Sequence, residues 1–169
     1  TMHLSPQQIL IIAVIAAVGC GLMAGLFFAF SNFVMKALRH QPTESGVRTM
    51  QSISAFIQNP IFFVLFFGTN LAAAVLAVTA VFRLSDPGAE LQLAGAALCL
   101  VGTFAVTVLV HIPLNNRLAQ IHPASEEMTR FWAFYVAKWS KWNHVRTITA
   151  MVATALLVVA IDQARAGTG

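Results

Sequence analysis

Two short segments carry most of the side chains that could do chemistry in this sequence. His111 to Arg117 closes an apolar stretch that begins near Leu91, and Trp139 to Arg146 leads into the apolar stretch 148–161. Polar side chains in membrane segments are costly to desolvate without partners, so such clusters predict a functional site. Histidine can act as a base near neutral pH, and arginine and asparagine can stabilise an oxyanion. The two segments therefore predict a functional site, provided that they meet, in which Arg146 would need an anion, a carbonyl cluster or an electron-rich ligand as its partner.

Helical periodicity sorts these candidates by face. One stripe, spaced i, i+3, i+4 and i+7, consists of Trp139, Trp142, Asn143 and Arg146. His144 lies about 100° from Asn143 around the same helix and points elsewhere. In the earlier segment, a row of small and polar residues spaced by four is expected to face protein; it consists of Thr103, Thr107, His111 and Asn115. Asn116 follows directly and joins the candidates.

Composition places these segments in a membrane. Of the 169 residues, 58% are hydrophobic and only 9% are charged, with a mean hydropathy of +0.76. A soluble domain carries roughly a quarter charged residues. We predict an all-α, polytopic bundle of four transmembrane helices that forms one domain over residues 1–169. The helices are expected at about 6–38, 49–83, 88–120 and 126–164.

Basic residues predict the orientation of the bundle. With Arg117 and Arg146 set aside as site residues, the connections after the first and third helices and their flanks still hold six basic residues, and the opposite side holds Arg83 and Arg165. The positive-inside bias then places both termini outside the cytoplasmic (plasma) membrane. The second and fourth helices, each about 50 Å or longer, would project on the cytoplasmic side. This connectivity brings both chemical segments to one depth.

Other features have a structural and a functional interpretation. Gln51 and Asn59 could contact a substrate, although an amide such as Asn59 more often cross-links helices. Pro60 predicts a kink in the second helix. Ala17, Gly21, Gly25 and Ala29 form a ridge of small residues that favours close helix contact, within the bundle or in a homo-oligomer.

Several function classes lack their sequence features. No Glu-x-x-His pair supports a carboxylate-bridged di-iron site, and the six carboxylates all fall in predicted loops or helix ends. A proton-coupled transporter would need an intramembrane carboxylate. There is no Walker or dinucleotide motif, and the dispersed net charge of +4 does not form a nucleic-acid patch.

Four sets of segments carry a family resemblance. They are Gly25–Ser31 with Val34–Met35, Met50–Gln51 with Asn59–Pro60, Pro113–Ala119, and Trp139–Thr147. This set resembles the DUF1772 family of small membrane proteins, which includes the fungal anthrone oxygenases. The resemblance implies four membrane helices and, for some members, oxidation of a polycyclic anthrone to a quinone with O2.

The chemistry of such a substrate suits the residues present. An anthrone can lose a ring C–H proton to give an electron-rich carbanion that reacts with O2 directly, so the protein needs a base and groups that stabilise an oxyanion. We assign the base to His111 or His144. The oxyanion would be held by Arg146, Asn143 and Asn115, and the rings would lie between Trp139 and Trp142.

Two alternatives stay open at this point. His111 and His144 could instead ligate copper or a haem iron in a membrane oxidase. The same pocket could also bind a quinone or lipid without catalysis, in a carrier or accessory protein. All three hypotheses share the partners, namely the lipid bilayer and a hydrophobic aromatic small molecule.

Overall fold

Four long apolar helices make up nearly all of the protein. The computed structural model describes residues 4–167, and no strand occurs among them. Four helices in this range are long and apolar enough to cross a membrane: Pro6–His40, Pro60–Val81, Ala89–Gln120 and Glu126–Ala166. The all-α, four-helix membrane fold predicted from the sequence is thereby confirmed.

The first long helix contains a π-helical turn. It comprises α1 (Pro6–Ala29), the π-helical segment η1 (Phe30–Val34) and α2 (Met35–His40). Ser5 and Gln8 form a reciprocal capping box at its start, with Pro6 in the first turn. The hydrogen-bond ladder changes register in η1, which makes backbone carbonyls of this region available to side chains from other helices.

The second long helix is broken where the sequence analysis predicted a kink. It comprises α3 (Thr43–Phe56) and α4 (Pro60–Val81) as separate helices. Pro60 lacks an N–H and disfavours a helical conformation in Asn59, whose backbone is extended. The Asn59 side chain accepts a hydrogen bond from Phe62 N at 3.0 Å and donates one to Phe56 O at 3.0 Å. The single continuous helix expected over 49–83 was therefore wrong.

The third and fourth long helices follow the predicted bounds within two residues. The third comprises α5 (Ala89–Leu98), two further π-helical segments, η2 (Cys99–Ala105) and η3 (Thr107–His111), and α6 (Ile112–Gln120). The fourth is the single helix α7 (Glu126–Ala166), which is N-capped by Ser125. Gly88, with φ +81°, provides the left-handed turn before α5.

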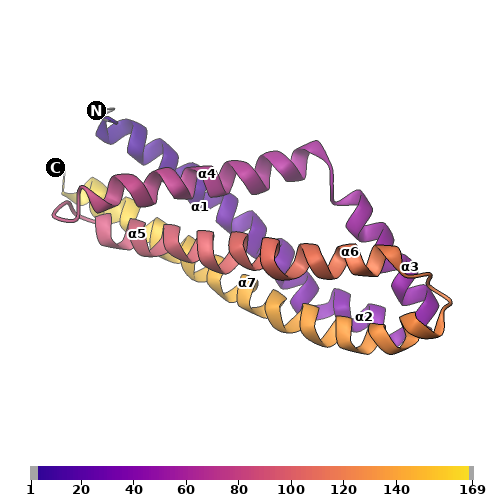
Figure 1. Cartoon of the computed structure of the whole chain (residues 1–169). Coiled ribbons are helices and arrows are strands. Elements are labelled where there is room, and N and C mark those ends of the chain that lie inside the picture. Colours follow the sequence, from indigo (N-terminus) through magenta and orange to yellow (C-terminus); the bar gives the residue numbers. More distant parts are fainter. Residues whose placement is uncertain (1–3, 168–169) are drawn as a thin grey trace.

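The connections divide between the two ends of the bundle. Both termini and the α4–α5 turn lie at one end, and the α2–α3 and α6–α7 connections lie at the other (Figure 1). The six basic residues from which the membrane orientation was predicted lie in the elements nearest the second end, namely α2, α3 and the first half of α7. They are Lys36, Arg39, Arg48, Arg130, Lys138 and Lys141. This arrangement is the one that the predicted topology requires, whereas the membrane face to which each end belongs stays a prediction.

The core differs in kind along the bundle. Toward the end with the termini it is built from small side chains, and we call this region the alanine half: Ile9, Ala13, Ala16, Ala17, Cys20, Ala73, Leu76, Ala96, Cys99, Ala153 and Leu157. Toward the other end large side chains dominate, and we call this region the aromatic half: Met23, Ala24, Phe27, Met35, Leu38, Val47, Met50, Phe66, Leu114, Leu118, Met128, Phe131, Trp132, Tyr135, Val136, Trp139 and Ala150.

Close helix contact in the alanine half does not follow the predicted small-residue ridge. A Cβ added at Gly19 would overlap Thr69 on α4, whereas one at Gly25 would meet nothing within 4 Å. Gly21 has only ordinary contact distances, of 3.7 Å to Thr154. Ala17 is the member of the predicted ridge that belongs to this core, together with Ala13, Ala16 and Cys20 on the buried face of α1. A role of Gly21 and Gly25 in a homo-oligomer stays a prediction.

Candidate functional site

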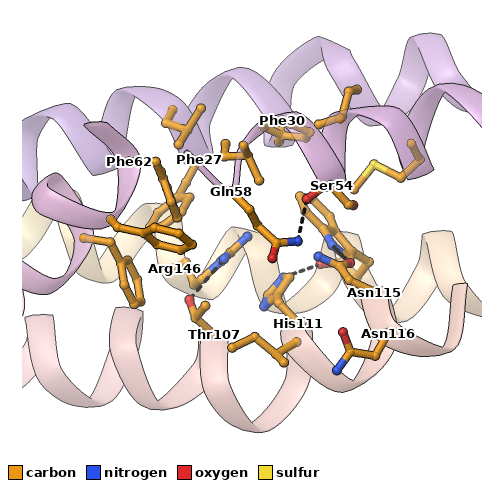
Figure 2. Close-up of a pocket in the computed structure, with 18 of the residues that line it drawn as sticks. Phe27, Phe30, Ser54, Gln58, Phe62, Thr107, His111, Asn115, Asn116 and Arg146 are labelled. Carbon is orange, nitrogen blue, oxygen red and sulfur yellow. Dashed lines mark hydrogen bonds between the residues drawn. The ribbon is translucent and has the colours of Figure 1, made fainter. Parts of the chain in front are cut away.

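A cavity of about 230 Å³ opens in the aromatic half. Its walls come from the end of α1 and η1, from α3, the start of α4, η3, α6 and the middle of α7. Six phenylalanines contribute to the apolar walls: Phe27, Phe30, Phe62, Phe63, Phe66 and Phe67. Figure 2 shows the polar groups among them, with Gln58 and Ser54 on one side and Arg146, Thr107, His111 and Asn115 on the other. The cavity is therefore greasy with a few polar groups, the composition typical of small-molecule sites.

Arg146 is the only cationic residue that lines this cavity among residues 4–167, and it is 6% exposed. Its Nη1 donates to Thr107 Oγ1 at 3.1 Å, its Nη2 donates to Asn143 Oδ1 at 2.7 Å, and its buried Nε has no hydrogen-bond partner. The ion pairs found in the described part of the chain involve Arg48 and Arg83 instead.

Aromatic rings complete the surroundings of this guanidinium. Its central carbon lies 4.2 Å from the ring centroid of Phe27 and 5.4 Å from that of Trp139. Ring faces attract a cation but do not neutralise it. An arginine keeps its charge in almost any protein environment, so neutral partners alone leave this site favourable to an anionic or electron-rich oxygen.

Asn143 holds Arg146 in place and does not line the cavity. It is fully buried, and its Nδ2 donates to Phe27 O and to Ser31 Oγ, both at 2.8 Å. The Phe27 carbonyl is close to the π-helical turn η1, where the backbone ladder changes register. Asn143 thus cross-links the first and fourth long helices and presents its carbonyl oxygen to the guanidinium, a positioning role and not the direct contact expected from the sequence.

His111 is buried on the same side of the cavity as Arg146 and lines it (Figure 2). Its Nε2 lies 3.3 Å from the Trp139 carbonyl oxygen, and its ring meets the Trp139 ring edge-on at 4.9 Å between centroids. A carbonyl oxygen can only accept, so the proton of a neutral imidazole lies on Nε2 and the lone pair on Nδ1. That Nδ1 has no hydrogen-bond partner within residues 4–167. This tautomer leaves a lone pair on Nδ1, which is buried in the wall of the cavity, and the Val106 carbonyl also lies near the ring.

Asn115 is fixed with its amide nitrogen available. Its Oδ1 accepts hydrogen bonds from Tyr135 Oη at 2.8 Å and from Trp139 Nε1 at 3.2 Å. Its Nδ2 makes no hydrogen bond to the described part of the chain, and the residue lines the cavity next to Asn116. A ligand oxygen could therefore accept from Asn115 Nδ2 without disturbing the contacts that orient it.

Five predicted site residues line the cavity and the others lie elsewhere. The lining residues are His111, Asn115, Asn116, Trp139 and Arg146. His144 is exposed on α7, as its phase relative to Asn143 predicted, and Trp142 is half-buried away from the cavity. Gln51 donates to Leu118 O at 2.8 Å and ties α3 to α6, while Asn59 caps α4. Both amides therefore satisfy backbone groups and do not face the cavity.

The histidine pair considered for copper or haem does not converge. His111 is buried and His144 is exposed, because residues 143 and 146 on the same helix face the core. Among residues 4–167 no group of three histidine, cysteine or acidic residues comes together. These side chains do not fit a metal centre within one chain.

Several residues at the site were missed or undervalued in the sequence. Gln58 and Tyr135 carried no motif, and Thr107 was noted only as part of a polar row. The three π-helical segments were also unforeseen, although two of them, η1 and η3, contribute cavity residues. Such segments are frequent at functional sites. Tyr135 could have been found from its spacing, since it lies four residues before Trp139 on the same face.

Fold and site together define an integral membrane helical bundle with a buried pocket that is walled by aromatic rings and contains one cationic residue. A family model described as anthrone oxygenase matches residues 62–156. Because this match covers more than half of the chain, the protein belongs to the anthrone oxygenase family, which confirms the resemblance found in the sequence. The matched region contains His111, Asn115, Trp139 and Arg146, whereas α1 and α3 lie outside it. The chain matches no curated protein and no solved structure.

Proposed function

We propose that this protein oxidises a flat, lipid-soluble anthrone-type substrate with O2 inside the cavity of the aromatic half. The observation that carries the proposal is the buried Arg146, which has only neutral partners and faces an aromatic-walled space beside His111. Membership of the anthrone oxygenase family supports the same reaction class. A guanidinium in a dry site stabilises developing negative charge on oxygen far better than water does.

The size and walls of the cavity suit such a ligand. Its 230 Å³ falls below the roughly 300–1,000 Å³ of sites for drug-sized ligands, which favours a compact, flat ring system. Phe62 and Phe66 stack at 5.7 Å between centroids, and Phe66 stacks on Phe104 at the same distance. Phe62 and Phe66, which line the cavity, would pack against the face of a fused aromatic substrate while its oxygen lies toward Arg146.

The position of the break favours supply of the substrate from the bilayer. Exposed residues on α3 are largely polar, as at Glu44, Arg48 and Ser52, whereas Ile61 and Val64 on α4 are exposed and apolar. The 22 residues of α4 would span about 33 Å, close to the hydrocarbon thickness of about 30 Å. The cavity beside the α3–α4 break would then lie at the edge of the hydrocarbon, accessible to a molecule dissolved in lipid.

The proposed reaction begins with proton transfer. His111 Nδ1 takes one proton from the ring CH₂ opposite the ketone, and the electron pair delocalises onto the ketone oxygen as an enolate. Arg146 and the Asn115 amide would donate to that oxygen. Typical contributions are about 10²–10⁴-fold for a positioned base and about 10²–10³-fold for one oxyanion donor.

The oxidation then needs no further reductant. The deprotonated ring carbon gives its electrons to O2 and forms a carbon–oxygen bond, and the proton held by His111 completes a hydroperoxide. Loss of the remaining hydrogen on that carbon, with cleavage of the O–O bond, releases water and leaves a second ketone. One oxygen atom of O2 ends in the quinone and the other in water, so the substrate supplies all four electrons.

Isotope incorporation tests this proposal directly. The purified protein in lipid nanodiscs is incubated with anthrone under ¹⁸O₂, and O2 uptake and the mass of the product are followed. We expect anthraquinone with one ¹⁸O atom, formed well above the autoxidation rate in empty nanodiscs. Saturable anthrone binding without accelerated quinone formation would instead establish a carrier or accessory role, and loss of turnover in the presence of a chelator would contradict the cofactor-free route.

A further inference from the structure

A second polar edge of the cavity lies on α3, outside the family match. Gln58, which lies in the break between α3 and α4, extends toward His111 (Figure 2). Its Nε2 donates to Ser54 O at 2.8 Å, which fixes the carboxamide. Its Oε1 makes no hydrogen bond to residues 4–167, and the buried Ser54 Oγ, one turn earlier, is also without a partner. Two polar oxygens at this edge thus have hydrogen-bonding capacity unused: Gln58 Oε1 belongs to an exposed side chain, and Ser54 Oγ is buried just behind the lining.

Other amide side chains near the α3–α4 break do not leave an oxygen unpaired as Gln58 does. Asn59 uses both ends of its side chain to cap α3 and α4, and Gln51 donates to the Leu118 and Ile121 carbonyls. Those side chains satisfy backbone groups, as irregular backbone in an apolar setting requires. Gln58 also donates to one backbone carbonyl, that of Ser54, but its own side-chain oxygen has no partner and lies at the edge of the cavity.

The two polar edges differ in what they offer a ligand. Arg146 and the Asn115 amide nitrogen are donors and need an acceptor oxygen, whereas Gln58 Oε1 can only accept and needs a donor. The Ser54 hydroxyl can do either. A ligand that complements both edges therefore carries an acceptor oxygen on one side and a hydroxyl group on another.

We propose that Gln58 and Ser54 are specificity-determining residues that bind a ring hydroxyl of the substrate on the edge away from the ketone held by Arg146. The proposal rests on the proposed function, since it assumes an anthrone-type ligand in the same cavity. A site built to bond a hydroxyl discriminates against the analogue that lacks it, because the protein group is then left unpaired. Gln58 is exposed, so we expect a modest preference of about tenfold, as for one hydrogen bond.

Binding without turnover isolates this inference from the reaction. Quenching of tryptophan fluorescence is titrated under anaerobic conditions in nanodiscs with three probes: anthrone, a monohydroxyanthrone with its hydroxyl beside the ketone, and one with its hydroxyl at the far ring edge. The wild-type protein should bind the far-edge isomer about tenfold more tightly than the other two. Gln58→Ala should remove that preference and leave the Kd of anthrone unchanged, and Ser54→Ala should reduce it.

Matched variants keep the test decisive. Gln58→Glu retains an acceptor oxygen and should keep the preference, while Gln120→Ala, an exposed glutamine at the end of α6, should behave as wild type. Since the preference is a ratio within each variant, a partly unfolded sample does not mimic its loss. Equal binding of all three probes by the wild type, or equal loss of all three in Gln58→Ala, would overturn the assignment. Aerobic quinone formation by the same wild-type sample would show that the proposed function nevertheless stands.

Discussion

The alanine half and the aromatic half are built on the same four long helices but solve different packing problems. In the alanine half, buried side chains such as Ala13, Ala73 and Ala153 let the helices approach closely, and the Cys20 and Cys99 thiols lie 3.3 Å apart. In the aromatic half, α3 and α4 separate at their break and the π-helical segments η1 and η3 face the opening. Small residues close one half of the bundle, and local irregularities open the other.

Polar groups are distributed according to the same division. Asn70 and Thr103, which are buried beside Cys99 of the alanine half, bond to backbone carbonyls one turn earlier on their own helices, at Phe66 O and Cys99 O. Arg146, His111 and Ser54 in the aromatic half each retain a buried atom without a partner. An unsatisfied buried polar atom costs about 1–3 kcal/mol. The contrast indicates that the cost of unsatisfied buried polar atoms is concentrated in the aromatic half, beside the cavity.

The largest expected loss of turnover distinguishes His111 from His144. His111→Gln should lower the rate of quinone formation by about 10²–10⁴-fold, because glutamine cannot accept the substrate proton. His144→Gln is the matched control, and its exposed position outside the cavity predicts unchanged turnover. O2 uptake measured at equal protein concentration checks both variants. Equal losses in the two variants would contradict the assignment of the base.

A somewhat smaller loss of activity is expected from Arg146, with the opposite effect on stability. Arg146→Met removes the oxyanion donor and should lower turnover by about 10²–10³-fold. Replacing a buried charge by an apolar side chain of similar length is often neutral or stabilising, so the Tm should be maintained or raised. Arg130→Met, an exposed position on α7, is the control for loss of one cation. A lower Tm for Arg146→Met together with its loss of turnover would contradict the expectation that this residue contributes to activity and not to stability.

The sequence was sufficient for the helices and for the convergence of the site. The lengths of the apolar stretches and the residues at helix starts predicted the bounds of three of the four long helices within two residues. The order of the helices along the chain was enough to predict that His111 and Arg146 lie at one depth. Helical phase also separated Asn143 and Arg146 from His144 correctly. These are local properties, and local sequence specifies them.

What the sequence could not specify depended on contacts between helices. Asn143 and Gln51 carry the residue types of a binding site, but the carbonyls of Phe27, Leu118 and Ile121 use their amides. The π-helical segments have no sequence pattern that distinguishes them from α-helix. Gln58 was missed because only the break at Pro60 turns its side chain into the cavity.

The alanine half should respond in stability where the aromatic half responds in activity. Gly19→Ala places a methyl group against Thr69, whose Cβ would lie 2.9 Å away, and overpacking of this kind costs about 1–3 kcal/mol. Gly25→Ala on the same helix meets nothing within 4 Å and should be neutral. Thermal unfolding in detergent compares the two. We expect a lower Tm for Gly19→Ala alone, with the turnover of its folded fraction preserved; equal Tm values would show that the halves do not differ in packing.

The smallest expected effect on turnover concerns the hydrogen bond between Tyr135 and Asn115, behind the residues that line the cavity. Tyr135 is fully buried, and its hydroxyl donates to Asn115 Oδ1, which Trp139 Nε1 also contacts. Tyr135→Phe removes one of two donors to a single acceptor, so no polar atom of Asn115 becomes wholly unpaired, and the loss of stability should be about 1 kcal/mol. Turnover should fall only a few-fold, because Trp139 alone still orients the Asn115 amide. The discriminating measurement is a double-mutant cycle, in which the Tm values of Tyr135→Phe, Asn115→Ala and the double variant are compared. We expect non-additive effects if Tyr135 acts through Asn115. Additive effects would mean that the Tyr135 hydroxyl stabilises another part of the aromatic half.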